Sequence, residues 1–262
     1  GHTRRLRPRA GLSYRIGPGR ALHAAYIESM HAPASHTLAP VAVGAIAIDH
    51  QYQRLGSLAR KRAVQLDWEI DARTFAWGVL SSQSIANPVF ADGRLLVPNL
   101  GSSVSDRAGV LAPVGASGQV VIDAYNGNPY FSQGRLHQAG AALNRVLTPH
   151  WSVLGSYTWA HSRNTGVQHA GNLLPGVPQH TGVLANVWRH GARDLTLASL
   201  VYRGSRFADE ANTQPQGAGW SFNLVLFRES ADRRWAWTGT LQTPLHGTVR
   251  PTLWTSLRYR MD

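Results

Sequence analysis

The sequence predicts an all-β protein, an antiparallel up-and-down transmembrane β-barrel of which about eleven strands lie in this chain. Three observations carry that prediction. Apolar residues recur at every second position in segment after segment, which is the period of a strand with two unlike faces. The opposite faces carry mostly small neutral side chains, and short links between the segments alternate with long ones. Such unequal rims are typical of barrels of outer membranes. Because the expected strand count is odd and bacterial single-chain barrels normally close with an even number, we expect residues 1–262 to be one segment of a larger barrel.

The first two strands are expected on either side of a short link at 17–20, the first ending near Ile16. Residues 64–71 then alternate clearly, with apolar side chains at the even positions. After the link at 71–74, Phe75, Trp77 and Val79 share one face of the next expected strand, and Ala76 and Gly78 share the other. Helical periodicity is strongest at 55–64 but lacks a convincing cap, so we interpret that stretch as a loop or a single turn.

Four later segments repeat the pattern, at 151–159, 220–226, 235–241 and 249–261. Tryptophan, tyrosine, leucine and valine occupy one face of each, and serine, threonine, asparagine or arginine much of the other. The short links between strands also include 147–150, 190–194 and 229–234. The long ones run over 28–60, 82–133, 161–179 and 204–219. The expected strands are about 9 to 11 residues long, as a tilted strand needs to cross a bilayer.

A soluble sandwich or barrel also shows alternation, and we keep it as an alternative. Three features favour the membrane: the polar face carries few charges, loops as long as 82–133 are uncommon in compact domains, and aromatic residues gather near segment ends. Such aromatic side chains form girdles where a barrel meets lipid headgroups. The expected lipid-facing girdle is Trp68, Trp77, Trp151, Trp159, Trp220, Trp235, Trp237 and Tyr259.

Two charged ladders are expected to line the lumen, because they lie opposite the apolar positions of their strands. The acidic one comprises Gln65, Asp67, Glu69 and Asp71, and the basic one comprises Arg250, Arg258 and Arg260. These side chains would either pair with a plug or line a path for a charged solute, or they would merely be solvated in a water-filled lumen and pair with one another.

The formal net charge of +12 comes from 26 basic and 14 acidic residues, and every basic residue except Lys61 is arginine. This balance favours anionic partners, and we expect outer-membrane lipid and lipopolysaccharide, not nucleic acid. Residues 4–9 contain four arginines that would meet lipopolysaccharide phosphates at the rim or simply reflect a GC-rich genome. The chain begins at Gly1 without a methionine, which we interpret as a fragment or a processed chain.

Sequence motifs for catalysis or metal binding are sparse. Cysteine is absent, no G-x-S-x-G elbow exists, and a Ser-His-Asp site would have to be assembled from scattered residues. The histidines at 161, 169 and 180 lack metal-ligand spacing. We therefore expect no catalytic residues, no metal site and no cofactor, and a protein that is not an enzyme.

Two resemblances refine this interpretation. The stretches LRPRAGLSYRIGPGRALHAAYIESMHAP (6–33), LTPHWSVLGSYTWAHSRN (147–164) and LPGVPQHTGVLANVW (174–188) resemble barrels of TonB-dependent receptors. The stretches HTLAPVAVGAIAIDHQ (36–51) and VQLDWEID (64–71) resemble barrels linked to periplasmic tetratricopeptide repeats. The first resemblance implies solute uptake across a bacterial outer membrane, and the second implies export of exopolysaccharide or other cargo. Either implies an N-terminal remainder of the same chain, a plug or a repeat domain, and a periplasmic energy-coupling or export partner.

Overall fold

Eleven strands of the protein form one antiparallel sheet in the computed structural model, which describes residues 7–30, 42–47, 52–53, 56–87, 131–245 and 251–259. The strands, in spatial order, are β1 (Arg9–Gly17), β2 (Arg20–Met30), β5 (Leu58–Asp71), β6 (Thr74–Ala86), β7 (Gln133–Thr148), β8 (Trp151–Asn164), β9 (His180–Arg189), β10 (Asp194–Arg203), β13 (Gly219–Glu229), β14 (Trp235–Pro244) and β15 (Thr252–Tyr259). The predicted all-β meander and its strand count are confirmed. The described residues contain no helix of the length and hydropathy that a membrane crossing requires.

Two small hairpins lie outside the main sheet. β3 (Ala42–Val43) pairs with β4 (Ile46–Ala47) between β2 and β5 in the chain, and β11 (Arg206–Phe207) pairs with β12 (Pro215–Gln216) between β10 and β13. Each hairpin therefore belongs to one of the long connections.

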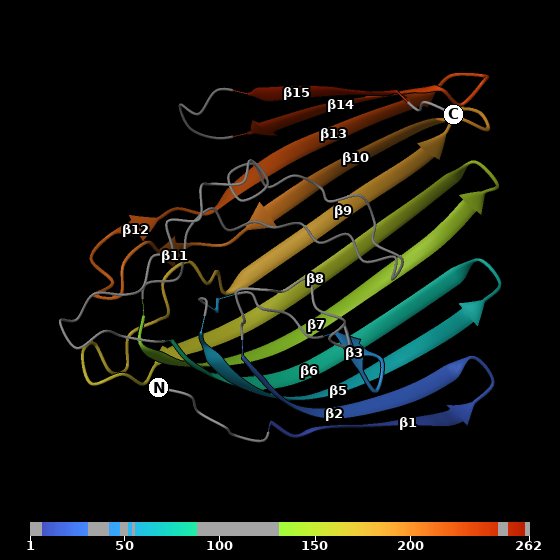
Figure 1. Cartoon of the computed structure of the whole chain (residues 1–262). Coiled ribbons are helices and arrows are strands. Elements are labelled where there is room, and N and C mark those ends of the chain that lie inside the picture. The colour runs from blue at the N-terminus through green and yellow to red at the C-terminus, as the bar shows by residue number, and fades with distance from the viewer. Residues whose placement is uncertain are drawn as a thin grey trace.

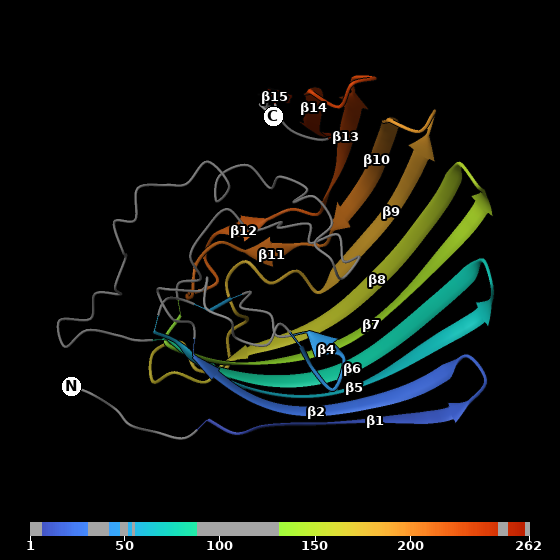
Figure 2. The same ribbon diagram turned by 45° about the vertical axis from the view of Figure 1, so that its right-hand side comes forward.

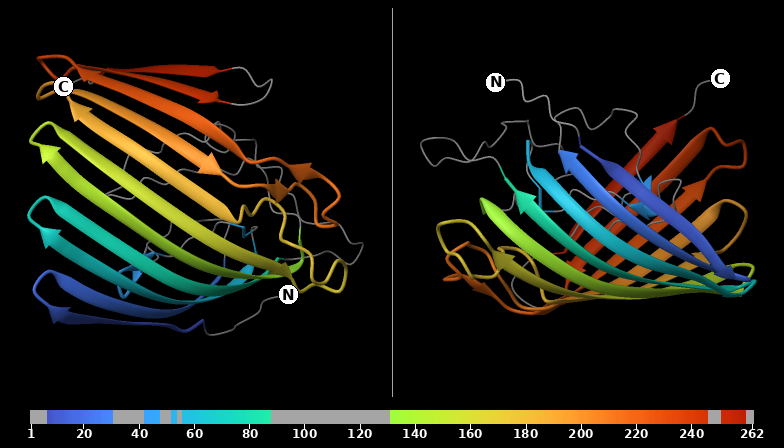
Figure 3. Two further views of the ribbon diagram at one scale, coloured as in Figure 1. Left: turned by 180° about the vertical axis from the view of Figure 1, so that it is seen from behind. Right: turned by 90° about the horizontal axis from the view of Figure 1, so that it is seen from below.

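The sheet is a curved trough with two different ends (Figures 1 and 3). The links from β1 to β2, β5 to β6, β7 to β8, β9 to β10 and β13 to β14 are tight and lie together at one end, the short-turn rim. The longer connections start from the opposite end, the long-loop rim, and the described parts of several fold back into the trough (Figure 2). The unequal rims follow from the alternation of link lengths along the chain.

Strand register assigns every side chain to one of two faces, because directly opposed residues of an antiparallel pair point the same way. The pairs Ala25↔Ala63 and Ala63↔Ser81 belong to the concave face, since Ala25 and Ala63 pack against Ile46 of the β3–β4 hairpin inside the trough. The alternate residues, including Val64 and Leu80, make up the convex face. Most of the large exposed apolar side chains of the strands lie on this convex face.

Two hydrophobic clusters lie on the concave side. The smaller holds Ile46 against Ala25, Ile27 and Ala63. The larger lies at the long-loop rim, where residues of the connections cover four concave strand positions, and comprises Tyr52, Ala59, Ile85, Phe131, Leu136, Ala160, Leu174 and Val177. The chain therefore buries apolar surface where its loops enter the trough.

The interpretation of residues 55–64 as a loop or turn was wrong, because β5 begins at Leu58. The first half of β5 pairs with a strand on each side: Leu58 lies opposite Met30 of β2 and opposite Ala86 of β6. Arg60 and Arg62 lie on the convex face of this half, and Ala59 and Ala63, with Lys61 between them, lie on the concave face. This half of β5 therefore alternates too, but its charged side chains include two on the face that is apolar in the second half, so hydropathy alone did not reveal the strand.

Candidate functional site: the concave wall

The concave wall of the trough carries short polar side chains at its centre, among apolar ones such as Val183, Val201 and Val225. Register places Ser156, Thr158, Thr181 and Ser199 on this face, together with Asn223. The Asn223 side-chain amide lies 3.3 Å from the Ser199 hydroxyl and donates a hydrogen bond to it. These short polar side chains are uncharged, so this part of the wall offers hydrogen bonds without a strong electric field.

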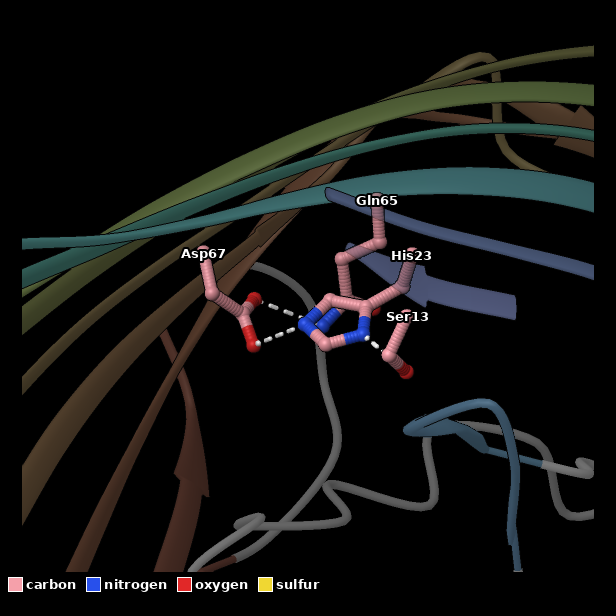
Figure 4. A network of polar contacts seen from close by, with 4 residues as sticks. All are labelled: Ser13, His23, Gln65 and Asp67. Carbon is pink, nitrogen blue, oxygen red and sulfur yellow. Dashed lines mark hydrogen bonds and ion pairs between the residues drawn. The ribbon is translucent and has the colours of Figure 1, made fainter. Parts of the chain in front are cut away.

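A polar network on β1, β2 and β5 is the most developed group on this wall (Figure 4). His23 Nδ1 lies 2.9 Å from Ser13 Oγ, and His23 Nε2 lies 3.2 Å from Asp67 Oδ2. The Gln65 amide donates a hydrogen bond of 2.8 Å to Asp67 Oδ1. Cross-strand pairs Ser13↔His23 and His23↔Gln65 create this arrangement, since they set the three side chains in one row.

His23 is 7% exposed and can carry its proton on either nitrogen, toward Asp67 or toward Ser13. The contact between Nε2 and Asp67 has an ion-pair distance but lacks hydrogen-bond geometry. Serine, histidine and aspartate in this order resemble a hydrolase triad in composition. Hydrolysis also requires donors aimed at an oxyanion. The Gln65 amide of this network donates to Asp67 Oδ1 instead.

The structure brings together only part of the predicted acidic ladder. Gln65 and Asp67 join the network, whereas Glu69 lies on the same face, exposed, opposite Phe75. Asp71 instead stabilises the β5–β6 turn, because its carboxylate accepts the Arg73 backbone N–H at 2.7 Å.

Of the predicted basic ladder, Arg258 lies on the concave face of β15, opposite Ala236. It is at the far edge of the sheet from the acidic residues, so the two ladders do not meet within this sheet. Arg250 and Arg260 lie outside the described residues. So do Arg4 and Arg5, while Arg9 points to the concave side, opposite Ile27.

One girdle residue is placed on the wrong face by the sequence interpretation. Trp77 pairs with Asp67 and with Ala142, so it lies on the concave face, away from the convex face that holds Trp68. The reason is the tight β5–β6 hairpin, whose register puts Ala76 and Gly78 on the convex side beside Trp68 and Leu66. The other seven predicted girdle residues lie on the convex face: Trp68, Trp151, Trp159, Trp220, Trp235, Trp237 and Tyr259.

The described connections at the long-loop rim form a loop cap, residues 165–179 and 204–218, over one end of the wall. The Asn164 amide donates to Glu210 Oε1 at 2.6 Å, and the Asn172 amide donates to the Glu210 carbonyl at 3.0 Å. Asn212 accepts the Leu173 N–H at 2.9 Å and donates to the Leu173 carbonyl at 3.0 Å. The two connections are therefore tied to each other and to the concave end of β8.

Asp209 stabilises the turn within this cap. Its carboxylate accepts hydrogen bonds from the Gln214 N–H at 2.7 Å and from the Thr213 hydroxyl at 2.8 Å. Partial desolvation raises the pKa of Asp209, but these hydrogen bonds outweigh it and hold the pKa below its ordinary value. The carboxylate consequently remains charged at neutral pH.

Solved structures of outer-membrane receptors share this fold. The chain is 10% identical to the ferric yersiniabactin uptake receptor FyuA from Yersinia pestis, with a TM-score of 0.55 over 89% of this chain and 31% of the receptor. For P. aeruginosa FpvA bound to heterologous pyoverdines the identity is 13% and the TM-score 0.52, over 98% and 33% of the two chains. For BauA, the ferric preacinetobactin receptor of Acinetobacter baumannii, they are 12% and 0.51, over 90% and 31%.

No protein-family model matches the sequence, and no curated protein matches it. The chain spans about a third of the length of the receptors that it resembles. At these identities the likeness establishes the fold alone. The protein thus has the fold of part of an outer-membrane receptor barrel, which favours the resemblance to TonB-dependent receptors over the one to repeat-linked barrels.

Proposed function

We propose that the chain forms part of the wall of a β-barrel in a bacterial outer membrane and that this barrel takes up a solute. The observation that carries the proposal is the difference between the two faces of the sheet: the convex face holds most of the large exposed apolar side chains, and the concave face holds the polar network of Ser13, His23 and Asp67. A barrel wall needs this difference, because one face meets lipid and the other meets water.

The exposure of apolar side chains supports a membrane rather than a soluble setting. Leu12, Leu80 and Leu253 are 67%, 65% and 71% exposed, and all three lie on the convex face. Soluble monomers rarely leave a contiguous apolar surface that spans a whole sheet. Lipid would cover these side chains without requiring any further protein.

The open order of the sheet supports a larger barrel. β1 and β15 end the strand order, and an unpaired edge in lipid leaves backbone groups that cost several kcal/mol each. Further strands of the same protein would pair with both edges, and a plug domain would enter the trough from the concave side. An energy-coupling partner in the periplasm belongs to the same proposal.

Uptake is favoured over export because the solved structures that resemble the chain include receptors named for ferric complexes. Ferric chelates are therefore the first cargo to test. The network of Ser13, His23 and Asp67 would contact such cargo or the plug as it passes the concave wall.

The test is uptake of radioactive iron chelates by cells that carry or lack the gene, with the protein located by membrane fractionation. We expect gene-dependent uptake and a protein in the outer-membrane fraction. The variant Asp67→Asn should lower uptake, while the convex control Leu66→Val should leave it unchanged. Release of a polymer that depends on the gene would indicate export, and a protein in the soluble fraction would refute the membrane barrel.

A further inference from the structure

A groove on the convex face combines apolar walls with a basic margin. It has a volume of about 800 Å³ and runs over β1, β2, β5, β6, β7 and β8. Register aligns Ala24, Val64, Leu80, Ala139 and Trp159 in one row across five of these strands. Small residues in this row, at 24 and 139, leave space beside the larger Leu80 and Trp159.

The next two rows toward the long-loop rim are basic. The first contains Tyr26, Arg62, Ser82, His137 and His161, and the second contains Glu28, Arg60, Ser84, Arg135 and Arg163. All four arginines and both histidines of these rows are exposed on the convex face. Arg62 and His137 also line the groove, so the basic margin adjoins its apolar floor.

Within the described part of the chain, Arg60 alone of these four arginines has an acidic partner. Arg60 forms an ion pair of 3.0 Å with Glu28, and Arg62 lies over the Tyr26 ring at 5.9 Å. Arg135 and Arg163 are direct cross-strand partners, an arrangement in which like charges repel. An anion between Arg135 and Arg163 would relieve their repulsion.

We propose that this groove and its arginine rows bind a phosphorylated lipid of the surrounding leaflet, with an acyl chain in the groove and phosphates on the arginines. The inference rests on the membrane setting of the proposed function. Arginine presents a planar fork that matches phosphate oxygens. Arg60 and Arg163 lie three strand spacings apart, about 14 Å, which suits a headgroup with two phosphates better than one with a single phosphate.

The test measures binding to the intact purified protein in detergent by native mass spectrometry, with bisphosphorylated lipid A as the probe. Monophosphorylated lipid A, phosphatidylglycerol and inorganic phosphate are the comparison probes. The double variant Arg135→Gln/Arg163→Gln should bind lipid A at least about tenfold more weakly, since each lost charged hydrogen bond is worth about tenfold. The matched control Arg20→Gln/Arg145→Gln removes two convex arginines at the short-turn rim and should bind normally.

Filling the groove tests the acyl chain separately. Ala139→Phe should weaken lipid A binding, while binding of the deacylated bisphosphorylated disaccharide should be unchanged. Heat-modifiable gel mobility verifies that each variant is folded. Equal lipid A binding by the test and control double variants would overturn the proposal. Displacement of lipid A by an equal concentration of inorganic phosphate would reduce the site to one for a free anion and also overturn it.

The outcome is separable from that of the uptake proposal. Cells whose protein imports a chelate but shows no arginine-dependent lipid binding would overturn only the lipid site. A protein that binds lipid A through these arginines but imports no solute would overturn only uptake.

Discussion

Substitution of Leu184 by arginine tests the assignment of faces most directly. Leu184 is 60% exposed on the convex side of β9, four residues from His180 and five from Arg189. At about 3.3 Å per residue and a tilt of about 40°, it lies roughly 10 to 13 Å from either end of the strand. This depth is near the middle of an apolar band about 25 Å tall.

An arginine at that depth costs about 2 to 4 kcal/mol of folding free energy in a bilayer. A value near 3 kcal/mol would shift the folding equilibrium by about two orders of magnitude. The matched control is Val183→Arg, one residue along the same strand and at nearly the same depth but on the concave face, between Ser156 and Val201. Because that face meets water in our proposal, the control should cost less than about 1 kcal/mol.

The free energy is measured by denaturant titration of the intact protein in lipid vesicles, with heat-modifiable gel mobility as the readout of folding. A larger loss from Val183→Arg than from Leu184→Arg would show that the faces are reversed. Equal small losses would show that neither face meets hydrocarbon.

Three further predictions concern the rims and turns. An epitope tag at Gln168 should be labelled on intact cells and one at Ala192 only after the outer membrane is opened; the reverse pattern would invert the sidedness. The Gly11→Ala variant should displace the β3–β4 hairpin, because an added Cβ would lie 2.6 Å from a backbone nitrogen of that hairpin, and limited proteolysis of residues 42–47 should accelerate. Gly17→Ala is the control, since nothing lies within 4 Å of its added Cβ, and equal proteolysis of the two variants would refute the contact. Hydrogen bonds from the Ser230 hydroxyl and a backbone N–H lower the pKa of Asp232. The stability that this carboxylate gives to the β13–β14 turn should therefore be fully present above the unfolded-state pKa, about 3.9. It should be lost as the pH falls through the lower folded-state pKa. An ordinary pKa for Asp232 in a nuclear magnetic resonance titration would contradict this.

Strand alternation predicted most of the convex face because β8, β13 and β14 place bulky residues at most of its positions. The same reasoning failed at Trp77, since an apolar series in β6 lies on the concave side beside Asp67. Alternation within one strand defines two faces but does not decide which of them points outward. Only the pairing with β5 decides it, and the register of a tight hairpin cannot be taken from hydropathy alone.

The polar network was only half predictable for a related reason. Gln65 and Asp67 were recognised because they share one face of one strand. Ser13 and His23 lie on two other strands, and the residues directly beside each of them in the sequence are uncharged, so no local pattern indicates a polar site. Predicting their place in the network requires the pairs Ser13↔His23 and His23↔Gln65, and therefore the register across three strands.

The loop cap has a consequence for how the protein can vary. Asn212 exchanges two hydrogen bonds with the backbone of Leu173, and Glu210 receives the amides of Asn164 and Asn172. Each connection therefore supplies groups that the other needs, and replacing one alone leaves unpaired polar groups in its neighbour. The pair should transplant into another barrel as a single module and should fail when either half is grafted separately.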